Sequence, residues 1–173
     1  MNAFTDASDR PLRHTQASSD VRANPLTVFE YIDRPERLSA HMARASWQLA
    51  GASMTIDTDA DGGRRVGSRM RFSGRMLGIA LHVDGEVVRR DSPNSKVWQT
   101  IGEPHLFVIG RYRMSVTVEP HDDDSHVTIA IDYAPPARGV ARWLGMIFGS
   151  LYARWCVQQM VDDLVHRFGV PTT

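Results

Sequence analysis

The chain has 173 residues, of which 42% are hydrophobic, and its 20 basic and 20 acidic residues give a formal net charge of zero. This length fits one domain with a substantial core. The neutral balance excludes the long-range attraction to nucleic acid or anionic membranes that a strongly basic chain has. The basic residues are nineteen arginines and a single lysine, Lys96, and the single cysteine, Cys156, excludes a disulfide within the chain.

The N-terminal residues differ from the rest of the chain. Residues 1–11 show no periodicity and are expected to form a flexible lead-in to a single domain over residues 12–173. They are polar and lack the apolar centre of a signal peptide. Further along, Arg142 and Arg154 interrupt the most apolar stretch, so no transmembrane segment is expected. These features predict a cytoplasmic protein.

The domain begins with a predicted edge strand and two short helices. Residues 12–20 alternate weakly and form the strand. Asn24-Pro25 is typical of a helix start, because asparagine caps free N–H groups and proline fits the first turn. The apolar stripe of this helix is Val28, Phe29 and Ile32. Pro35 restarts the pattern in a second helix, whose apolar positions are Leu38 and Met42.

From Trp47 onward the hydrophobic period changes to two, which is the period of strands. Short turn-forming segments at 59–63 and 121–125 indicate hairpin connections, which make neighbouring strands antiparallel. The expected strands are 47–58 with a bulge at Gly51, 66–76, 79–87, 96–101, 111–118 and 127–133.

A long helix is predicted from Arg138 to Phe168, between a pair of prolines and Gly169. Its second half has one apolar stripe. Its first half is expected to be covered on most sides, because large apolar residues point in almost every direction from Trp143 to Cys156. A line of small residues at every fourth position allows either close packing or space for a ligand. These residues are Ala141, Gly145, Gly149 and Ala153.

The order of elements limits the fold. An antiparallel sheet with one apolar face needs a cover, and the C-terminal helix is the only element large enough. We therefore expect an α+β fold in which a curled sheet of seven antiparallel strands wraps around that helix, with two short helices after the first strand.

Several stretches match those of a known group of proteins: Ala23-Asn24-Pro25 leading into Val28-Phe29 and Ile32-Asp33, Val66-Gly67-Ser68, Arg113–Pro120 running into Val127–Tyr133, and Tyr152–Cys156 leading to Met160. In them the chain resembles the SRPBCC superfamily of helix-grip proteins, which includes START-like lipid carriers, pollen allergens and polyketide cyclase/dehydrase-like proteins. The glycine-rich phosphate loop of the allergens is missing, so the chain is most similar to the bacterial cyclase-like branch.

The resemblance implies a cavity between sheet and helix that binds a small hydrophobic molecule, either lipid-like or polyketide-like. Methionines and tyrosines among the inward residues suit such a pocket, although for any single residue a place in an ordinary core is the commoner role. Met70 belongs to the inward set. The residues expected to bind the ligand are Phe72, Leu81, Val83, Tyr112, Met114, Val116, Ile129, Ile131, Tyr133, Leu144, Phe148, Gly149, Leu151 and Trp155.

Two other functions stay open: a polyketide cyclase or dehydratase that uses the same cavity, and a protein-interaction module without a ligand. No catalytic residue can be assigned, because no Ser-His-Asp or Cys-His arrangement follows from spacing. Polar groups available to the cavity are Tyr112, Tyr133, Gln99 and His41. Cys156 is interpreted as a small core residue.

Metal and nucleic-acid sites are not expected. Residues 121–126 contain metal-ligand types, but a hairpin tip favours a solvated turn. The outward arginines lack interleaved aromatic residues and so predict a solvated, partly paired face; they are Arg69, Arg71, Arg75, Arg111 and Arg113. His82, Asp84 and Glu86 are also predicted to face solvent. We expect no metal and no cofactor, and a homodimer is compatible with the sequence.

Overall fold

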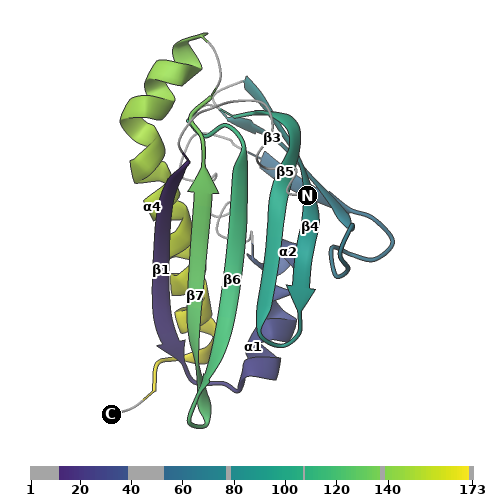
Figure 1. The fold of residues 1–173 in the computed structure, drawn as a ribbon, viewed down its shortest axis with the longest axis vertical. Coiled ribbons are helices and arrows are strands. Elements are labelled where there is room, and N and C mark those ends of the chain that lie inside the picture. Colours follow the sequence, from purple (N-terminus) through teal and green to yellow (C-terminus); the bar gives the residue numbers. More distant parts are fainter. Residues whose placement is uncertain (1–11, 39–52, 77–78, 107, 137–138, 172–173) are drawn as a thin grey trace.

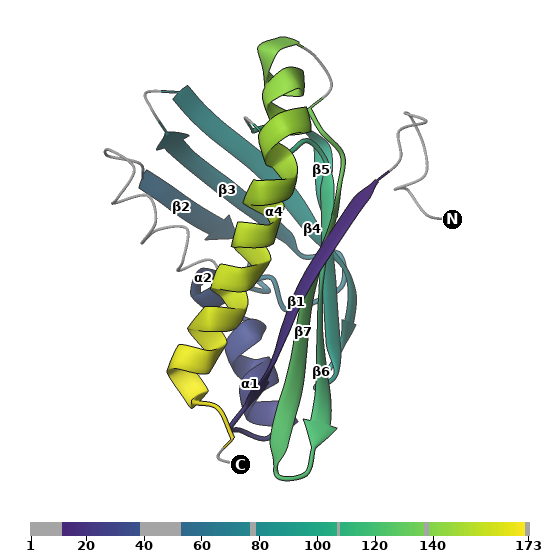
Figure 2. The same cartoon turned by 90° about the vertical axis from the view of Figure 1, so that its left-hand side faces the viewer.

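The computed structural model describes residues 12–38, 53–76, 79–106, 108–136 and 139–171. A sheet of seven antiparallel strands, in the order β1-β7-β6-β5-β4-β3-β2, curls around one long helix (Figures 1 and 2). The predicted fold class is therefore confirmed. The strands are β1 (Arg13–Val21), β2 (Ser53–Thr58), β3 (Arg69–Met76), β4 (Ile79–Asp91), β5 (Ser95–His105), β6 (Tyr112–His121) and β7 (Asp124–Tyr133). The helices are α1 (Pro25–Ile32), α2 (Pro35–Leu38) and α4 (Gly139–Phe168).

The start of α1 follows the predicted capping chemistry. The Asn24 side chain accepts a hydrogen bond from the Thr27 amide at 2.9 Å, which satisfies one of the free donors of the first turn. At the other end, the Asp33 amide donates to the Phe29 carbonyl at 2.8 Å. The second helix follows at Pro35, whereas its predicted continuation to Met42 lies outside the described residues.

Several predicted strands have different boundaries in the structure, and β3 and β5 show why. β3 begins at Arg69 instead of Val66, because the residues before it complete the β2–β3 loop. Gly67 has a φ of +88° and donates its amide to the Val87 carbonyl at 2.8 Å. Asp59 organises the same loop by accepting from the Ser68 hydroxyl at 2.6 Å. β5 extends to His105, since its pairing with β4 continues to His82. The first part of the strand predicted over 47–58, including Gly51, lies outside the described residues.

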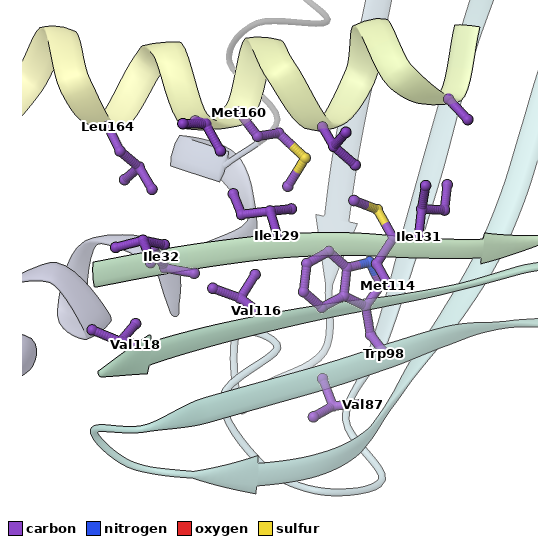
Figure 3. Packing of buried hydrophobic residues seen from close by; sticks show 14 of the residues in the cluster. Ile32, Val87, Trp98, Met114, Val116, Val118, Ile129, Ile131, Met160 and Leu164 are labelled. Atoms are coloured by element: carbon purple, nitrogen blue, oxygen red, sulfur yellow. The ribbon is translucent and has the colours of Figure 1, made fainter. Parts of the chain in front are cut away.

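The core lies between the concave face of the sheet and the second half of α4. Figure 3 shows Met160 and Leu164 of α4 facing Ile129 of β7 and Val116 of β6. All four side chains are buried. Full burial of an aliphatic side chain contributes about 1.5–3 kcal/mol, so this seam anchors the helix to the sheet. The predicted apolar stripe of the second half is confirmed.

The prediction that the first half of α4 is covered on most sides is wrong. Trp143, Phe148 and Leu151 are 66%, 47% and 67% exposed, and Met146 and Ile147 are exposed too. Length accounts for the exposure of the first turns. Thirty residues make a helix of about 45 Å, whereas the nine residues of β1 span only about 30 Å. The first turns of α4 therefore extend past the neighbouring strand (Figure 1).

The glycines of that half pack against backbone. A Cβ at Gly149 would lie 2.9 Å from the Val108 carbonyl oxygen, and one at Gly145 would lie 2.8 Å from the same atom. The Cβ at Gly145 would also meet Pro136. Contacts this short leave no room for a side chain. The two glycines therefore allow the backbone around Val108 to pack directly against the helix. Of the two explanations for their spacing, close packing agrees with the structure.

The outer face of the sheet carries ion pairs, as the sequence suggests. Arg71 donates to Asp84 at 2.8 Å, and His82 lies 3.1 Å from the other oxygen of the same carboxylate. At the β6–β7 end, His121 and His126 both contact Asp20, at 3.3 and 2.7 Å. Among the described residues no group of three potential metal ligands occurs. No described helix is long and apolar enough to cross a membrane.

Candidate ligand-binding site

A cavity lies between the concave face of the sheet, the α1–α2 region and the middle of α4. The cavity has an open volume of about 110 Å³. Its wall is mostly aliphatic, aromatic and methionine side chains, the composition typical of small-molecule pockets. The lining residues are Ile32, Pro35, Met70, Phe72, Leu81, Val83, Lys96, Trp98, Leu106, Ile109, Tyr112, Met114, Ile131, Tyr152, Cys156 and Met160.

The structure brings part of the predicted ligand-binding set to this wall. The predicted residues that line the cavity are Phe72, Leu81, Val83, Tyr112, Met114 and Ile131, and Met70 of the inward set joins them. They come from adjacent strands, because β3 pairs with β4 and β6 pairs with β7. In the register, Phe72 pairs with Val83 and Met114 pairs with Ile131. Alternation along the strands placed them on the inward face of the sheet.

The other predicted residues do not line the cavity. Val116, Ile129 and Tyr133 are buried in the packed core. Gly149 is buried against Val108, as described above. Leu144 and Trp155 are half-buried, and Phe148 and Leu151 are exposed. Of the polar candidates, Gln99 follows Trp98 on β5 and so lies on the opposite face, and His41 is outside the described residues.

Sequence reasoning missed the face of α4 that borders the cavity. Tyr152, Cys156 and Met160 are spaced by four and therefore lie one above another on the helix. That spacing was visible in the sequence, but the large apolar residues around it obscured which side faced inward. It also missed the α1–α2 residues Ile32 and Pro35, and Leu106 and Ile109 beyond β5.

Three protic groups lie beside the apolar wall, two from α4 and one, Tyr112, from β6. The side chains of Tyr152 and Cys156, one turn apart on the helix, form a hydrogen bond with each other. Burial raises the pKa of Cys156 to about 12, although this hydrogen bond acts in the opposite direction. The pKa of Tyr152 is raised by Cys156 and by burial, and that of Tyr112 by burial first and Cys156 second. All three groups are neutral hydrogen-bond donors at neutral pH.

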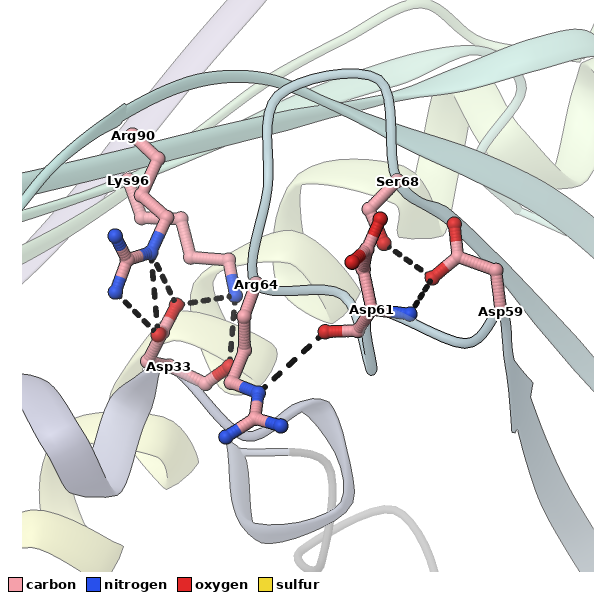
Figure 4. Close-up of polar contacts among 7 residues, drawn as sticks. All are labelled: Asp33, Asp59, Asp61, Arg64, Ser68, Arg90 and Lys96. Atoms are coloured by element: carbon pink, nitrogen blue, oxygen red, sulfur yellow. Dashed lines mark hydrogen bonds and ion pairs between the residues drawn. The ribbon is translucent and has the colours of Figure 1, made fainter.

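A buried ionic cluster forms at the α1–α2 side (Figure 4). The Lys96 Nζ donates to the Asp33 carbonyl at 2.8 Å and to its Oδ1 at 2.9 Å. Arg90 donates to Asp33 Oδ2 through Nη2 at 2.8 Å and contacts both carboxylate oxygens through Nε. Burial favours protonation of Asp33, but the bonds from Arg90 and Lys96 outweigh it and hold its pKa below the usual value. Burial lowers the pKa of Lys96.

The sequence matches one family of known proteins over most of its length. Residues 13–169 match the family described as polyketide cyclase / dehydrase and lipid transport. No curated protein matches the sequence.

Solved structures share the fold at low sequence identity. Norcoclaurine synthase from Thalictrum flavum, in complex with dopamine and hydroxybenzaldehyde, has a TM-score of 0.61 at 17% identity, covering 90% of this chain and 86% of its own. Major latex-like protein 151 from Panax ginseng has a TM-score of 0.57 at 17% identity, with 91% and 97% covered. A Chromobacterium violaceum protein has a TM-score of 0.60 at 16% identity, with 91% and 98% covered.

Proposed function

Because the chain belongs to the polyketide cyclase / dehydrase and lipid transport family, we propose that it binds a small hydrophobic molecule, lipid-like or polyketide-like, in the cavity under α4. Family membership supports binding of hydrophobic molecules in general. The observation that carries the proposal for this chain is the open space itself. Protein cores are close-packed, so a cavity of about 110 Å³ lined by methionine, aromatic and aliphatic side chains is unusual in a region that only stabilises the fold.

The wall suits a ligand that is mostly apolar and has few polar atoms. Burial of its apolar surface would contribute about 25 cal/mol per Å², before the costs of ordering are subtracted. Met70, Met114 and Met160 have flexible side chains that adapt to the shape of a ligand. Tyr112 and Tyr152 offer hydroxyl donors to a carbonyl, ether or hydroxyl oxygen. The cavity thus combines adaptable apolar contacts with a small number of orienting groups.

A cavity-filling substitution tests the proposal. Val83 lines the cavity, and Val83→Phe would place a ring in the open space. We expect it to abolish saturable binding of the neutral dye N-phenyl-1-naphthylamine, measured by fluorescence, with little loss of stability. Val116→Phe is the matched control, because Val116 faces the same core but not the cavity. Overpacking there should cost about 1–3 kcal/mol of stability. If the parent protein shows no saturable binding of any apolar probe, the proposal fails.

A catalytic role in the same cavity is favoured by one observation, the convergence of Tyr112 and Tyr152 on an apolar wall. Their raised pKa values keep both phenols protonated, so they could polarise a substrate carbonyl as donors but could not abstract a proton at neutral pH. The test is turnover of a polyketide-like substrate by the parent and by Tyr112→Phe. If the enzyme hypothesis is right, the variant should lose turnover but still bind the dye.

A further inference from the structure

Lys96 is the only lysine in the chain, and it lies in an unusual place. Lys96 as a whole is only 2% exposed. It faces inward on β5, on the same side as Trp98, and lines the cavity. Lysine is almost never fully buried without a partner. Any ligand in the cavity therefore lies next to a cation.

The charges around Lys96 are only partly paired at short range. Arg90 and Lys96 share one hydrogen-bonded carboxylate, that of Asp33, and the Glu36 carboxylate acts on Lys96 only from beyond ion-pair distance. The Arg90 side chain is 29% exposed and can reach water, whereas the Lys96 side chain is only 3% exposed. Of the two cations, Lys96 is thus the one that water cannot solvate. Among the described residues, Asp33 is the only acid within ion-pair distance of either cation.

The geometry of the ammonium leaves room for another acceptor. An ammonium group has three N–H donors. In the described part of the chain, two acceptors contact the Lys96 Nζ, and both belong to Asp33. Burial lowers the pKa of Lys96, which reflects the cost of keeping this charge away from water. A second anion beside the ammonium would offset that cost.

We propose that the cavity takes an amphiphilic acid, whose carboxylate binds the Lys96 ammonium while its apolar chain lies along Trp98, Met114 and Ile131. The inference rests on the proposed ligand binding and specifies the chemistry of the ligand. The sheet register indicates how long the apolar chain of the ligand can be. Lys96 pairs with Val116 of β6. Tyr112 lies four residues before Val116 on the same strand, which places it about 13 Å from Val116 at 3.3 Å per residue. A medium-length chain therefore extends from the cation toward the two phenols, which can bind a neutral oxygen at its far end.

The experiment compares decanoic acid with decanol, which has the same chain without the charge. Each displaces N-phenyl-1-naphthylamine from the parent protein at pH 7.5, where the acid is ionised. We expect the parent to bind decanoate about tenfold more tightly than decanol, or better. Lys96→Met, which keeps the length of the side chain but removes its charge, should lose this preference and keep its affinity for decanol within about twofold.

Arg71→Met is the matched control. It removes one positive charge from the outer face, where Arg71 pairs with Asp84, and should leave the preference for decanoate unchanged. Equal affinities of the parent for decanoate and decanol would overturn the proposal without any variant, so the test holds even if Lys96→Met does not fold. A preference that persists in Lys96→Met would also overturn it. If the dye itself shows no saturable binding, the proposed function has failed instead.

Discussion

Substitution of Gly149 by alanine tests how the long helix is held. In an isolated helix the change would stabilise by up to about 1 kcal/mol, because glycine is a poor helix former. In this protein the new Cβ would lie 2.9 Å from the Val108 carbonyl oxygen, which is closer than side-chain carbons approach in real structures. That segment is fixed, since the nearby Gly110 amide donates to the Ala134 carbonyl at 2.8 Å. The backbone therefore cannot move away freely.

The two effects have opposite signs, and packing should be the larger. Overpacking typically costs about 1–3 kcal/mol, so after the gain in helix propensity we expect Gly149→Ala to lower the free energy of unfolding by about 1–2 kcal/mol. For a chain of this size, that corresponds to a fall in Tm of about 2–8 °C. Dye binding should be unchanged, because Gly149 is not on the cavity wall.

Urea unfolding followed by circular dichroism measures the effect. Ser150→Ala is the control, since Ser150 is the exposed neighbour on the same helix and its substitution adds helix propensity without a contact. It should leave stability unchanged or raise it by up to about 0.5 kcal/mol. If Gly149→Ala is as stable as Ser150→Ala, Gly149 is not needed for the close packing of the Val108 segment against the helix, and our packing argument is wrong.

Four further results are expected. Asp33→Asn removes the only paired acid of the buried cluster and should lower the free energy of unfolding by about 3 kcal/mol; a loss below about 1 kcal/mol would contradict the cluster's structural importance. Leu151→Ser should change stability by less than about 0.5 kcal/mol, because Leu151 is exposed, and a large loss would mean that the side chain is covered in solution. The Cys156 thiol should resist Ellman's reagent at pH 8 and react fully in denaturant, since burial raises its pKa to about 12; rapid native reaction would refute that burial. The hydrogen bond to Asp132 raises the pKa of His14 above 6.5, so its stabilising contribution is complete below about that pH and lost as pH rises through the folded value; an NMR titration should show the pKa falling in Asp132→Asn.

Local patterns predicted the elements and their order well. Asn24-Pro25 marks the start of α1 because capping involves only neighbouring residues. Two-residue alternation located the paired strands β6 and β7, since successive side chains on a strand point to opposite faces. Hairpin-length turns then required antiparallel neighbours. Where prediction failed, as at Val66 in the β2–β3 loop, contacts from distant residues such as Val87 decided the boundary.

The candidate site was predictable only in part. Alternation tells which face of a strand a residue occupies but not how deep it lies. Met114 and Val116 therefore look equivalent in sequence, yet one borders the cavity and the other fills the core. Lys96 illustrates a second limit. As a charged residue it was assigned no place inside, because its partner Asp33 lies 63 residues away and only folding brings the two together.

The sequence by itself determined the architecture: a strand, two short helices, six strands and a long helix can bury their apolar faces in few ways other than a sheet curled around the helix. Only the tertiary structure decided where that architecture leaves space. The relative lengths of α4 and β1 expose the first turns of the helix, and backbone against Gly145 and Gly149 closes the groove there. The cavity lies instead further along the helix, because open volume depends on how all surrounding side chains pack together and is not a property of any single segment.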